Sequence, residues 1–468
     1  MTTAHTATRR HPYPLLLVLL AALALRLVLL AFTRDTPLVV WDEGDYVRLA
    51  QGILHRGEFA FEPGKPTSMR PPLYPAFVAG VFAVAGDGNL QAVRLAQAIL
   101  SLLLVATVHA VGRRLYNERT ALWAAGFVAF YPSLILANYL VLTEVLFTLW
   151  LVLTCLAFVR LSETGGGAWA LATGVALGLA ALTRSVLWPF PVVIVPLTVW
   201  AARGTTTRRL ALGALVAFGY LVVVMPWAVR NTLLQGVVTA VDTMGGMNLR
   251  VGNYEYTPDD RMWSAAFSYR DERLWSHDLG DPGEDASRWT DGQKDKRAQR
   301  RALEYMVAHP ATTLRRSAIR FADFWGLERE FVALVRDGKY RPPRWFALGT
   351  TVAVTLSFVA VALSAAVGLF GAPPANLRAH AFNILLIAFI CGIHSLVFAH
   401  SRYRLPITPL LAIYASAALV TRPLWTRRGV AARVGCATAC VLLLAIWVRQ
   451  LALSDAARIS TFLKALWP

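Results

Sequence analysis

Carboxylates gather at the end of an apolar run near the start of the chain. The segment VVWDEGDYVRLA places Asp42, Glu43 and Asp45 directly after hydrophobic residues, and a further acid, Glu144, lies a few residues inside the apolar run NYLVLTEVLFTLW. Carboxylates at such positions can accept a proton from a reacting hydroxyl or hold a cation. The alternative for the first group is a helix that starts near Asp45, because the positive end of a helix attracts acidic side chains. An acid at the depth of Glu144 is a functional candidate unless a neighbouring arginine satisfies it.

Arginines stand at the boundaries of other apolar runs, all on the outer side in the topology derived below. They are Arg70 in MRPPLYP, Arg184 in LTRSVLWPFP, Arg230 in MPWAVRN, and Arg402 and Arg404 in HSRYRLP. This placement opposes the usual preference of Lys and Arg for the cytoplasmic side, and guanidinium groups match pairs of phosphate oxygens. Each arginine alone can instead snorkel to lipid headgroups or pair with the acids. As a set around two acidic sites, they predict a membrane-borne phosphate substrate.

The composition is that of an integral membrane protein. Hydrophobic residues make up 56% of the 468 residues, charged residues only 16%, and the mean hydropathy is +0.49. The net charge of +18 does not indicate nucleic-acid binding, because Lys and Arg punctuate apolar runs instead of clustering on a solvated face. The four cysteines lie inside apolar runs, and we interpret them as small buried hydrophobic residues: Cys155, Cys391, Cys436 and Cys440.

Apolar runs long enough to cross the bilayer as helices recur along the chain. We predict about eleven spans, at 13–32, 91–111, 120–136, 140–160, 168–184, 186–201, 210–228, 346–370, 380–399, 405–421 and 433–452. The first run follows Arg9 and Arg10 and has no small-residue cleavage site, so we expect a retained helix with a cytoplasmic start. Short Arg-rich loops, such as that with Arg113 and Arg114, then lie inside, and the C-terminus lies outside. Residues 71–86 are apolar but short and rich in proline, which favours a re-entrant or interfacial segment.

The spans divide the chain into three parts. Residues 1–229 form a membrane module with a first outer loop at 33–70, residues 230–345 form a larger outer region, and residues 346–468 supply the C-terminal helices. The second half of the outer region is expected to contain two amphipathic helices near the membrane surface, separated by Pro310.

Several motifs, in this order, resemble one family of membrane enzymes. They are DEGDYVRLA after the first helix, RPPLYPAFVAG, LTEVLF, PWAVRN followed by GGMNLRVGN, and RYRLP near the end. The chain resembles the GT-C class of polyprenyl-phosphate-sugar glycosyltransferases, in particular the bacterial relatives of protein O-mannosyltransferases and of the lipid A aminoarabinose transferase (glycosyltransferase family 39-like). The resemblance implies a GT-C fold, with a membrane module of seven helices that carries the active site on its outer face and variable helices after it.

The resemblance also implies roles for individual residues. Asp42 corresponds to the family's catalytic acid, Glu144 to the acid of the second loop, and Arg70 to a basic residue that contacts the donor phosphate. Some relatives hold a divalent metal cation with an acid just before that basic residue. Met69 occupies this position here, so the need for a metal cofactor stays open.

The expected reaction follows from these assignments. A sugar on a polyprenyl phosphate needs a base for the incoming hydroxyl and cations to hold the departing phosphate. We expect Asp42 to be the base, Glu43 or Glu144 to orient the acceptor or a cation, and arginines to bind the phosphate: Arg70, Arg184, Arg402 and Arg404. Aromatic residues within or beside the motifs are assigned to substrate binding: Tyr46, Tyr74 and Tyr403.

The expected reaction is the transfer of a hexosyl or pentosyl group with inversion at the anomeric carbon. We expect it to take place on the outer face of a bacterial plasma membrane. The acceptor can be a lipid glycan, a cell-envelope polymer or a protein, and the outer region is expected to select it. The alternatives are a flippase or transporter of lipid-linked substrates and a non-catalytic membrane scaffold. Transporters place ionisable groups near mid-membrane in repeated halves. Convergence of Asp42 and Glu144 on one outer site would therefore favour the transferase.

Overall fold

The computed structural model describes residues 13–34, 36–259, 262, 288–421, 425 and 429–466. Across these residues the chain is almost entirely helical, and its strands form one antiparallel hairpin of β1 (Ala60–Glu62) and β2 (Lys65–Pro66). The predicted all-α polytopic membrane fold is confirmed. Arg9 and Arg10, as well as residues 263–287 of the outer region, lie outside the described residues.

The elements fall into a long-helix bundle and a set of shorter elements. The bundle contains α1 (Tyr13–Phe32), α4 (Leu90–Leu115), α5 (Glu118–Phe130), α6 (Pro132–Leu136), α7 (Glu144–Thr164), α8 (Gly167–Thr183), α9 (Pro191–Ala201), α10 (Thr206–Gln235), α17 (Arg344–Gly371), α18 (Leu377–Leu396), α19 (Thr408–Thr421) and α20 (Val430–Arg449). The shorter helices are α2 (Trp41–Arg56), α3 (Leu73–Ala85), α11 (Gly245–Gly252), α14 (Asp291–Ala308), α15 (Pro310–Trp325), α16 (Glu330–Arg336) and α21 (Ala456–Leu466). Short segments of other helix types are η1 (Ala137–Tyr139), η2 (Ser185–Leu187), η5 (Ser401–Ile407) and η7 (Gln450–Ser454).

Each of the eleven expected spans coincides with an apolar helix. Within the described residues, eight helices are long and apolar enough to cross a membrane, and α5 with the α6–η1 segment forms a ninth unit bent by 53°. The other two expected spans, 168–184 and 186–201, correspond to α8 and α9, which have 17 and 11 residues. Residues 71–86 contain α3, whose 13 residues extend about 20 Å and fall short of the roughly 30 Å hydrocarbon layer.

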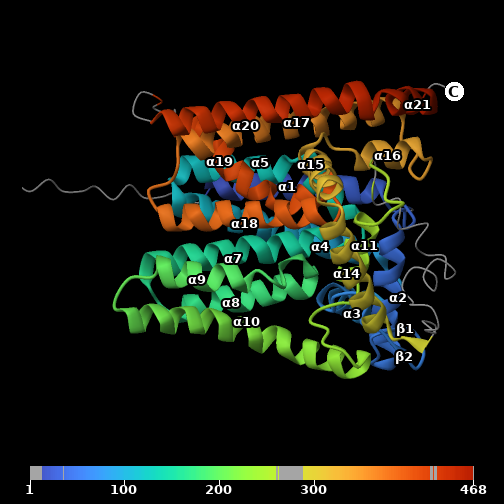
Figure 1. Cartoon of the computed structure of the whole chain (residues 1–468). Coiled ribbons are helices and arrows are strands. Elements are labelled where there is room, and N and C mark those ends of the chain that lie inside the picture. Colours follow the sequence, from blue (N-terminus) through green and yellow to red (C-terminus); the bar gives the residue numbers. More distant parts are fainter. Residues whose placement is uncertain are drawn as a thin grey trace, which may run out of the picture.

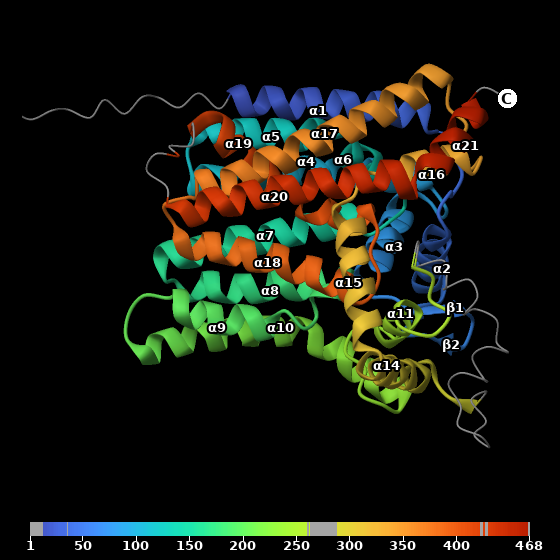
Figure 2. The same cartoon turned by 45° about the horizontal axis from the view of Figure 1, so that its top comes forward.

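The bundle helices run side by side, and the shorter elements gather at one end of them (Figures 1 and 2). This end carries α2, α3, the β1–β2 hairpin, α11 and α14, with α16 and α21 beside them. Elements from the first and last thirds of the chain therefore meet at one face. We refer to it as the loop end of the bundle.

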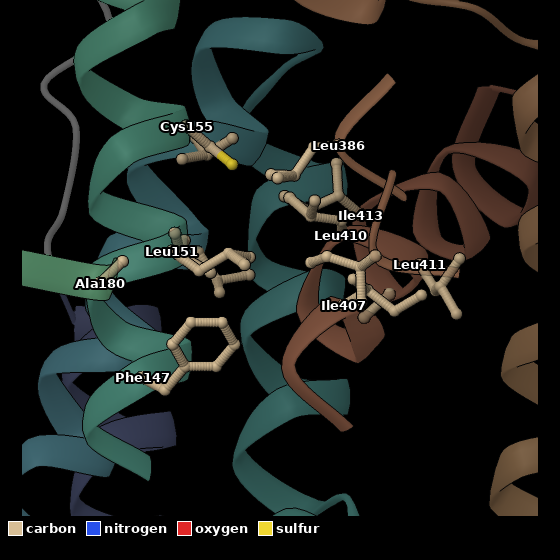
Figure 3. Packing of buried hydrophobic residues seen from close by; sticks show 14 of the residues in the cluster. Phe147, Leu151, Cys155, Ala180, Leu386, Ile407, Leu410, Leu411 and Ile413 are labelled. Atoms are coloured by element: carbon tan, nitrogen blue, oxygen red, sulfur yellow. The ribbon is translucent and has the colours of Figure 1, made fainter. Parts of the chain in front are cut away.

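A continuous apolar core joins α7 to the C-terminal helices. Phe147, Leu151 and Cys155 occupy successive turns of one face of α7, and they point toward Leu386 of α18 and Leu410 of α19 (Figure 3). All five side chains are buried. The four-residue spacing puts the α7 side chains on one stripe, so this packing fixes α7 and the turn before α19 relative to each other. Cys155, Cys391 and Cys436 are buried free thiols, as expected, whereas Cys440 is only half-buried, contrary to the expectation.

Local hydrogen bonds set the start and end of α2. The Oε2 atom of Glu43 accepts bonds from the backbone amides of Val39 and Val40, both at 2.7 Å, and its Oε1 atom accepts one from Val141 at 2.8 Å. The bonds from Val39 and Val40 satisfy amides at the positive end of α2. The helix ends at Gly57, whose φ of 66° is a left-handed conformation that glycine adopts without strain. Glu43 thus joins the first outer loop to the segment before α7.

Arg94 reinforces the same junction from α4. It is fully buried, and its guanidinium donates to the carbonyls of Thr33 at 2.9 Å, Thr36 at 2.7 Å and Tyr139 at 3.0 Å. The end of α1 and the turn before α7 are therefore held against the start of α4. This arrangement positions the two acidic segments beside each other.

The outer region and the Arg113–Arg114 loop lie at opposite ends of the bundle. The 26 residues of α4 extend about 39 Å, so Arg113 and Arg114 are far from the junction at its start. In contrast, the outer region begins at the loop end, where Thr243 donates a backbone bond to Ser68 at 3.0 Å. The two segments therefore lie at opposite ends of the bundle, as the predicted topology requires.

Candidate functional site

Arg70 links Asp42 and Asp45 at the loop end. Asp42 and Asp45 lie three residues apart on α2 and share one helix face. The Nη2 atom of Arg70 donates to Oδ1 of Asp42 at 2.7 Å and to Oδ2 of Asp45 at 2.8 Å. Asp45 also pairs with the exposed Arg48 at 2.8 Å. The Asp42 side chain keeps 30% of its surface exposed, whereas that of Asp45 keeps 7%, so Asp42 is the more accessible of the two.

A second arginine connects the first acids to Glu144. Arg402, in the η5 turn, lies 3.6 Å from Oδ2 of Asp42, 3.3 Å from Oε1 of Glu144 and 3.5 Å from Oε1 of Glu330. Its side chain is only 16% exposed. Arg184 adds a hydrogen bond to the same Oε1 atom of Glu144 at 3.1 Å. We call Asp42, Asp45, Glu144, Glu330, Arg70, Arg184 and Arg402 the acid–arginine cluster.

Aromatic rings support the arginines of the cluster. The guanidinium carbons of Arg184 and Arg402 lie 5.5 Å and 5.8 Å from the centre of the Tyr403 ring, and that of Arg70 lies 5.6 Å from the Tyr46 ring. Cations at this distance from an aromatic face are attracted by the ring quadrupole. The rings therefore hold each guanidinium in place without using its hydrogen-bond donors.

Three of the predicted site residues neither belong to this cluster nor contact its arginines: Glu43, Tyr74 and Arg404. Within the described residues, Glu43 accepts its hydrogen bonds from backbone amides, two at the start of α2 and one in the segment before α7. Tyr74 is fully buried and donates its hydroxyl to Oε1 of Gln97 at 2.8 Å, although its ring packs edge-on against Tyr46. Arg404 is also fully buried, where it donates to Glu328 at 3.0 Å and to the Phe324 and Gly326 carbonyls. Their contacts are those of residues that position the site.

Arg230 is held beside the cluster and not within it. Its guanidinium donates to the carbonyl of Thr67 at 2.6 Å and to the side chain of Asn231 at 2.9 Å, and it stacks on Trp227 at 4.6 Å. These contacts fix the segment that leads into Arg70. Arg230 therefore orients the loop that carries a cluster residue.

Nearby arginines determine whether the carboxyl groups of Asp42 and Glu43 are favoured in the ionised form. Burial would raise the pKa of the Asp42 carboxyl, but the Arg70 and Arg402 guanidinium groups more than offset it and hold that pKa below its ordinary value. The pKa of Arg70 is raised: burial opposes the charge, but Tyr46, Asp42 and Asp45 outweigh it. The Glu43 carboxyl has no arginine within ion-pair distance among the described residues, and burial raises its pKa. Asp42 is consequently an ionised, accessible carboxylate at neutral pH.

Two members of the cluster, Asp45 and Glu330, and the neighbouring Asp242 were not assigned to the site from the sequence. Asp45 was noted only as part of the acidic triplet, and Glu330 follows the amphipathic helices without any distinguishing motif. Asp242 accepts a bond from the Met244 amide at 3.2 Å, and burial raises its pKa while Ser185 and Arg70 oppose this rise. For Asp45, the three-residue spacing to Asp42 was the usable signal. Glu330 and Asp242 are brought in by tertiary packing alone.

The oxygen donors of the cluster do not fit a divalent metal site. Among the described residues, no group of three or more His, Cys, Asp or Glu side chains is arranged to hold a metal ion. The guanidinium of Arg70 stands between Asp42 and Asp45, and Met69 precedes it. The carboxylate oxygens that a divalent metal would need as ligands are therefore paired with arginine nitrogens.

Comparisons with known proteins place part of the chain in a family context. Residues 69–229 match the family model described as dolichyl-phosphate-mannose-protein mannosyltransferase. The resemblance to the GT-C glycosyltransferases is therefore confirmed over this segment. It includes Arg70, Glu144 and Arg184, whereas Asp42 and Arg402 lie outside it. No curated protein matches the chain.

Solved structures with a similar course of the chain are distant in sequence. The oligosaccharyltransferase AglB from Archaeoglobus fulgidus, in complex with an inhibitory peptide and a dolichol-phosphate, has 14% identity and a TM-score of 0.49. The match covers 97% of this chain and 56% of that one, so the present chain spans just over half the length of that protein. ArnT from Cupriavidus metallidurans bound to undecaprenyl phosphate has 16% identity and a TM-score of 0.40, with 85% and 77% of the two chains covered.

Proposed function

We propose that the protein is a membrane glycosyltransferase that moves a sugar from a polyprenyl-phosphate donor to an acceptor at the loop end of the bundle. The observation that carries the proposal is the position of Arg402, within 3.6 Å of Asp42 and 3.3 Å of Glu144. Two acids from the first turns of separate helices, α2 and α7, thus converge on one cation at the loop end. The family match at residues 69–229, whose description names a lipid-phosphate sugar donor, supports the same class of reaction.

The arginines of the cluster suit a phosphate ester. Arg70, Arg184 and Arg402 each point hydrogen-bond donors at carboxylates of the cluster. A phosphate group that enters from the membrane surface offers these donors charge-assisted hydrogen bonds of the same kind. The guanidinium groups would then stabilise the negative charge that develops on the phosphate as it leaves the sugar. Tyr46 and Tyr403 hold the guanidinium groups at the required positions.

Asp42 is the general base in this proposal. Arginines keep its carboxylate ionised, but ion pairing also weakens it as a base. A donor phosphate that binds to Arg70 and Arg402 would compete for their donors and release Asp42 toward the acceptor. The carboxylate would then take the proton of the acceptor hydroxyl. Donor binding and base activation are therefore coupled by the same two arginines.

The bond changes balance without a further reactant. The acceptor oxygen forms a bond to the anomeric carbon, the bond from that carbon to the phosphate oxygen breaks, and its electron pair leaves with the polyprenyl phosphate. The acceptor proton goes to Asp42. Attack from the side opposite the phosphate inverts the configuration at the anomeric carbon. Glu144 holds Arg184 and Arg402 at the phosphate side.

In this proposal residues 230–345 select the acceptor, residues 1–229 form the catalytic module, and the C-terminal helices of residues 346–468 add Arg402 to the site. The described part of the outer region packs at the loop end through Thr243 and supplies Glu330 to the cluster. A lipid glycan, a cell-envelope polymer and a protein are the acceptor classes considered, with a hexose or pentose as the sugar. The proposed location is the bacterial plasma membrane, with the loop end on its outer side. The proposed reaction uses no metal ion, because the carboxylates of the cluster are paired with arginines and do not form a metal site among the described residues.

Product formation by the purified protein tests the function. The protein in lipid nanodiscs would be given synthetic polyprenyl-phosphate sugars together with extracts of each acceptor class, and release of polyprenyl phosphate would be measured. The expected result is release that depends on an acceptor and is lost in Arg70→Gln. If reconstituted vesicles move the intact donor across the bilayer and no polyprenyl phosphate is released, the transporter alternative is correct and the transferase proposal is wrong.

A further inference from the structure

Arg26 is a buried cation without an ion-pair partner among the described residues. It lies on α1, six residues before Phe32, and is 1% exposed, at a depth of about 9 Å from the helix end. Its Nε donates to Oγ of Ser101 at 2.7 Å, and its Nη1 donates to the carbonyls of Ala22 and Ala129 at 3.1 Å and 3.0 Å. An arginine at this depth inside an apolar helix is expensive and marks a functional position.

Glu144 has one oxygen that its arginines do not use. Arg184 and Arg402 both contact the Oε1 atom, at 3.1 Å and 3.3 Å. The Oε2 atom is buried and accepts no hydrogen bond from the described residues. A buried carboxylate oxygen that lacks a donor loses its hydration without replacement and destabilises the fold. The second oxygen therefore requires a partner on its other side.

One small cavity has both Arg26 and Glu144 in its wall. Ser101 is the third polar residue of the lining, and the remaining lining residues are apolar: Leu104, Val128, Leu134, Ala137 and Val145. The space within the cavity that the centre of a water molecule can occupy is about 10 Å³. This is the space that a single water requires. The Nη2 atom of Arg26 makes no hydrogen bond to the described residues, like the Oε2 atom of Glu144.

We propose that one ordered water in this cavity links Arg26 to Glu144, and that Arg26 is a positioning residue of the acid–arginine cluster. The water would donate to Oε2 of Glu144 and accept from Nη2 of Arg26, so it satisfies both groups. The attraction between the two charges is strong because little solvent screens it. Glu144 is thereby held with Oε1 turned toward Arg184 and Arg402. The link itself depends only on the geometry, whereas its effect on the donor rests on the proposed function.

A double-mutant cycle on stability tests the link without any substrate. Arg26→Met removes the charge and keeps an apolar side chain, and Glu144→Gln removes the partner charge. We expect Arg26→Met to lower the unfolding midpoint by about 5 °C or more in the parent, and by less than half as much in the Glu144→Gln background, because the link is already broken there. The control pairs Arg26→Met with Asp87→Asn, a remote exposed acid, for which additive effects are expected. Additive effects in the first pair would overturn the proposal.

A cavity-filling variant keeps the proposal testable if Arg26→Met does not fold. Ala137→Val adds apolar volume to the cavity wall, displaces the water and removes no charge. We expect it to weaken binding of a synthetic polyprenyl phosphate about tenfold, with no further loss when it is combined with Glu144→Gln. Unchanged affinity in folded Ala137→Val protein would contradict a water-mediated role. If the parent itself binds no polyprenyl phosphate, the proposed function is wrong, and the stability cycle alone decides the link.

Discussion

The Nη2 atom of Arg402 lies 3.6 Å from Oδ2 of Asp42, although the two residues come from opposite ends of the chain. The same guanidinium reaches Glu144 and Glu330. The first outer loop, the start of α7, the outer region and the turn before α19 therefore meet at one side chain. A site assembled in this way forms only when the whole bundle is folded.

Arg402 is expected to bind the donor phosphate, whereas Arg404 stabilises the fold. Arg402→Gln removes charge-assisted hydrogen bonds of about 1.5–3 kcal/mol, so we expect affinity for a polyprenyl phosphate to fall at least about tenfold. Thermal stability should fall less than in Arg404→Gln, because Asp42 and Glu144 keep Arg70 and Arg184 as partners. Arg402→Lys restores the charge but not the planar fork, and it should recover only part of the affinity. Titration of each detergent-solubilised variant with the lipid phosphate measures its affinity.

The matched control for Arg402 is Arg404. Arg404→Gln leaves Glu328 as a buried, unpaired acid and is expected to reduce the unfolding midpoint and the yield of folded protein. Any protein that does fold should bind the lipid phosphate nearly as well as the parent. Equal loss of affinity in folded Arg402→Gln and Arg404→Gln protein would show that our distinction between the two arginines is wrong.

Glu43 is expected to act on stability. Glu43→Ala leaves the amides of Val39, Val40 and Val141 without their acceptor, at roughly 1 kcal/mol or more for each bond. We therefore expect a loss of about 3 kcal/mol in the free energy of unfolding, measured with a chemical denaturant. Glu62→Gln is the control, because Glu62 is exposed and Lys65 is its one ion-pair partner among the described residues, and it should change stability by less than about 0.5 kcal/mol. Similar stabilities of the two variants would contradict the assignment.

Asp295 is expected to make stability depend on pH. Burial, with help from Asp242, raises the pKa of the Asp295 carboxyl to about 6, although the amides of Gly246 and Met247 oppose the rise. The folded chain thus holds this proton more tightly than the unfolded chain. The resulting stabilisation is complete below the ordinary aspartate pKa and is lost as the pH rises through about 6.

Asp295→Asn removes this titration. Between about pH 4 and about pH 7, the parent should lose on the order of 2 kcal/mol relative to Asp295→Asn. Unfolding of both proteins across this range measures the difference. A constant difference between parent and variant at every pH would mean that Asp295 does not titrate in this range.

The loop end is expected to face away from the cytoplasm. Glu304, on α14, and Arg113, at the far end of α4, have exposed side chains. Cysteine at position 304 should react with a membrane-impermeant maleimide on intact cells, whereas cysteine at position 113 should react only after the membrane is opened. The reverse pattern would invert the topology and place the cluster on the cytoplasmic side.

Much of the helical architecture was predictable because the bilayer imposes it. Every expected span coincides with an apolar helix, since hydropathy over about twenty residues reports directly on burial in lipid. The helices α8 and α9 are shorter than typical spans, which hydropathy alone does not distinguish from full spans. The brevity of α3 was foreseeable from the same length argument.

The cluster was predictable in part, and the exceptions have physical reasons. Asp42, Glu144, Arg70, Arg184 and Arg402 lie at ends of apolar runs, and these ends meet at one face. Arg404 was grouped with Arg402 because the two are close in sequence, but η5 is a 3₁₀ helix with three residues per turn, so positions two apart project in different directions.

Arg26 and Asp45 had signals that were not used. Arg26 is an isolated charge in the middle of the leucine-rich run LALRLVLL, which is a functional signal in a membrane helix. Asp45 lies three residues from Asp42 on the same helix, and it shares Arg70 with Asp42, at 2.8 Å. Asp45→Asn is therefore expected to reduce activity as well, through Arg70, and it does not serve as a control.

The most direct test of the account is sugar transfer by Asp42→Asn. Asparagine keeps the shape and can accept a hydrogen bond, but it does not take a proton. Loss of a general base lowers rates by about a hundredfold to ten-thousandfold, so we expect turnover to fall within this range while the unfolding midpoint stays within a few degrees. Asp87→Asn, an exposed acid that pairs with His55, should retain parental turnover. Parental turnover by folded Asp42→Asn would contradict the assignment of Asp42 as the base.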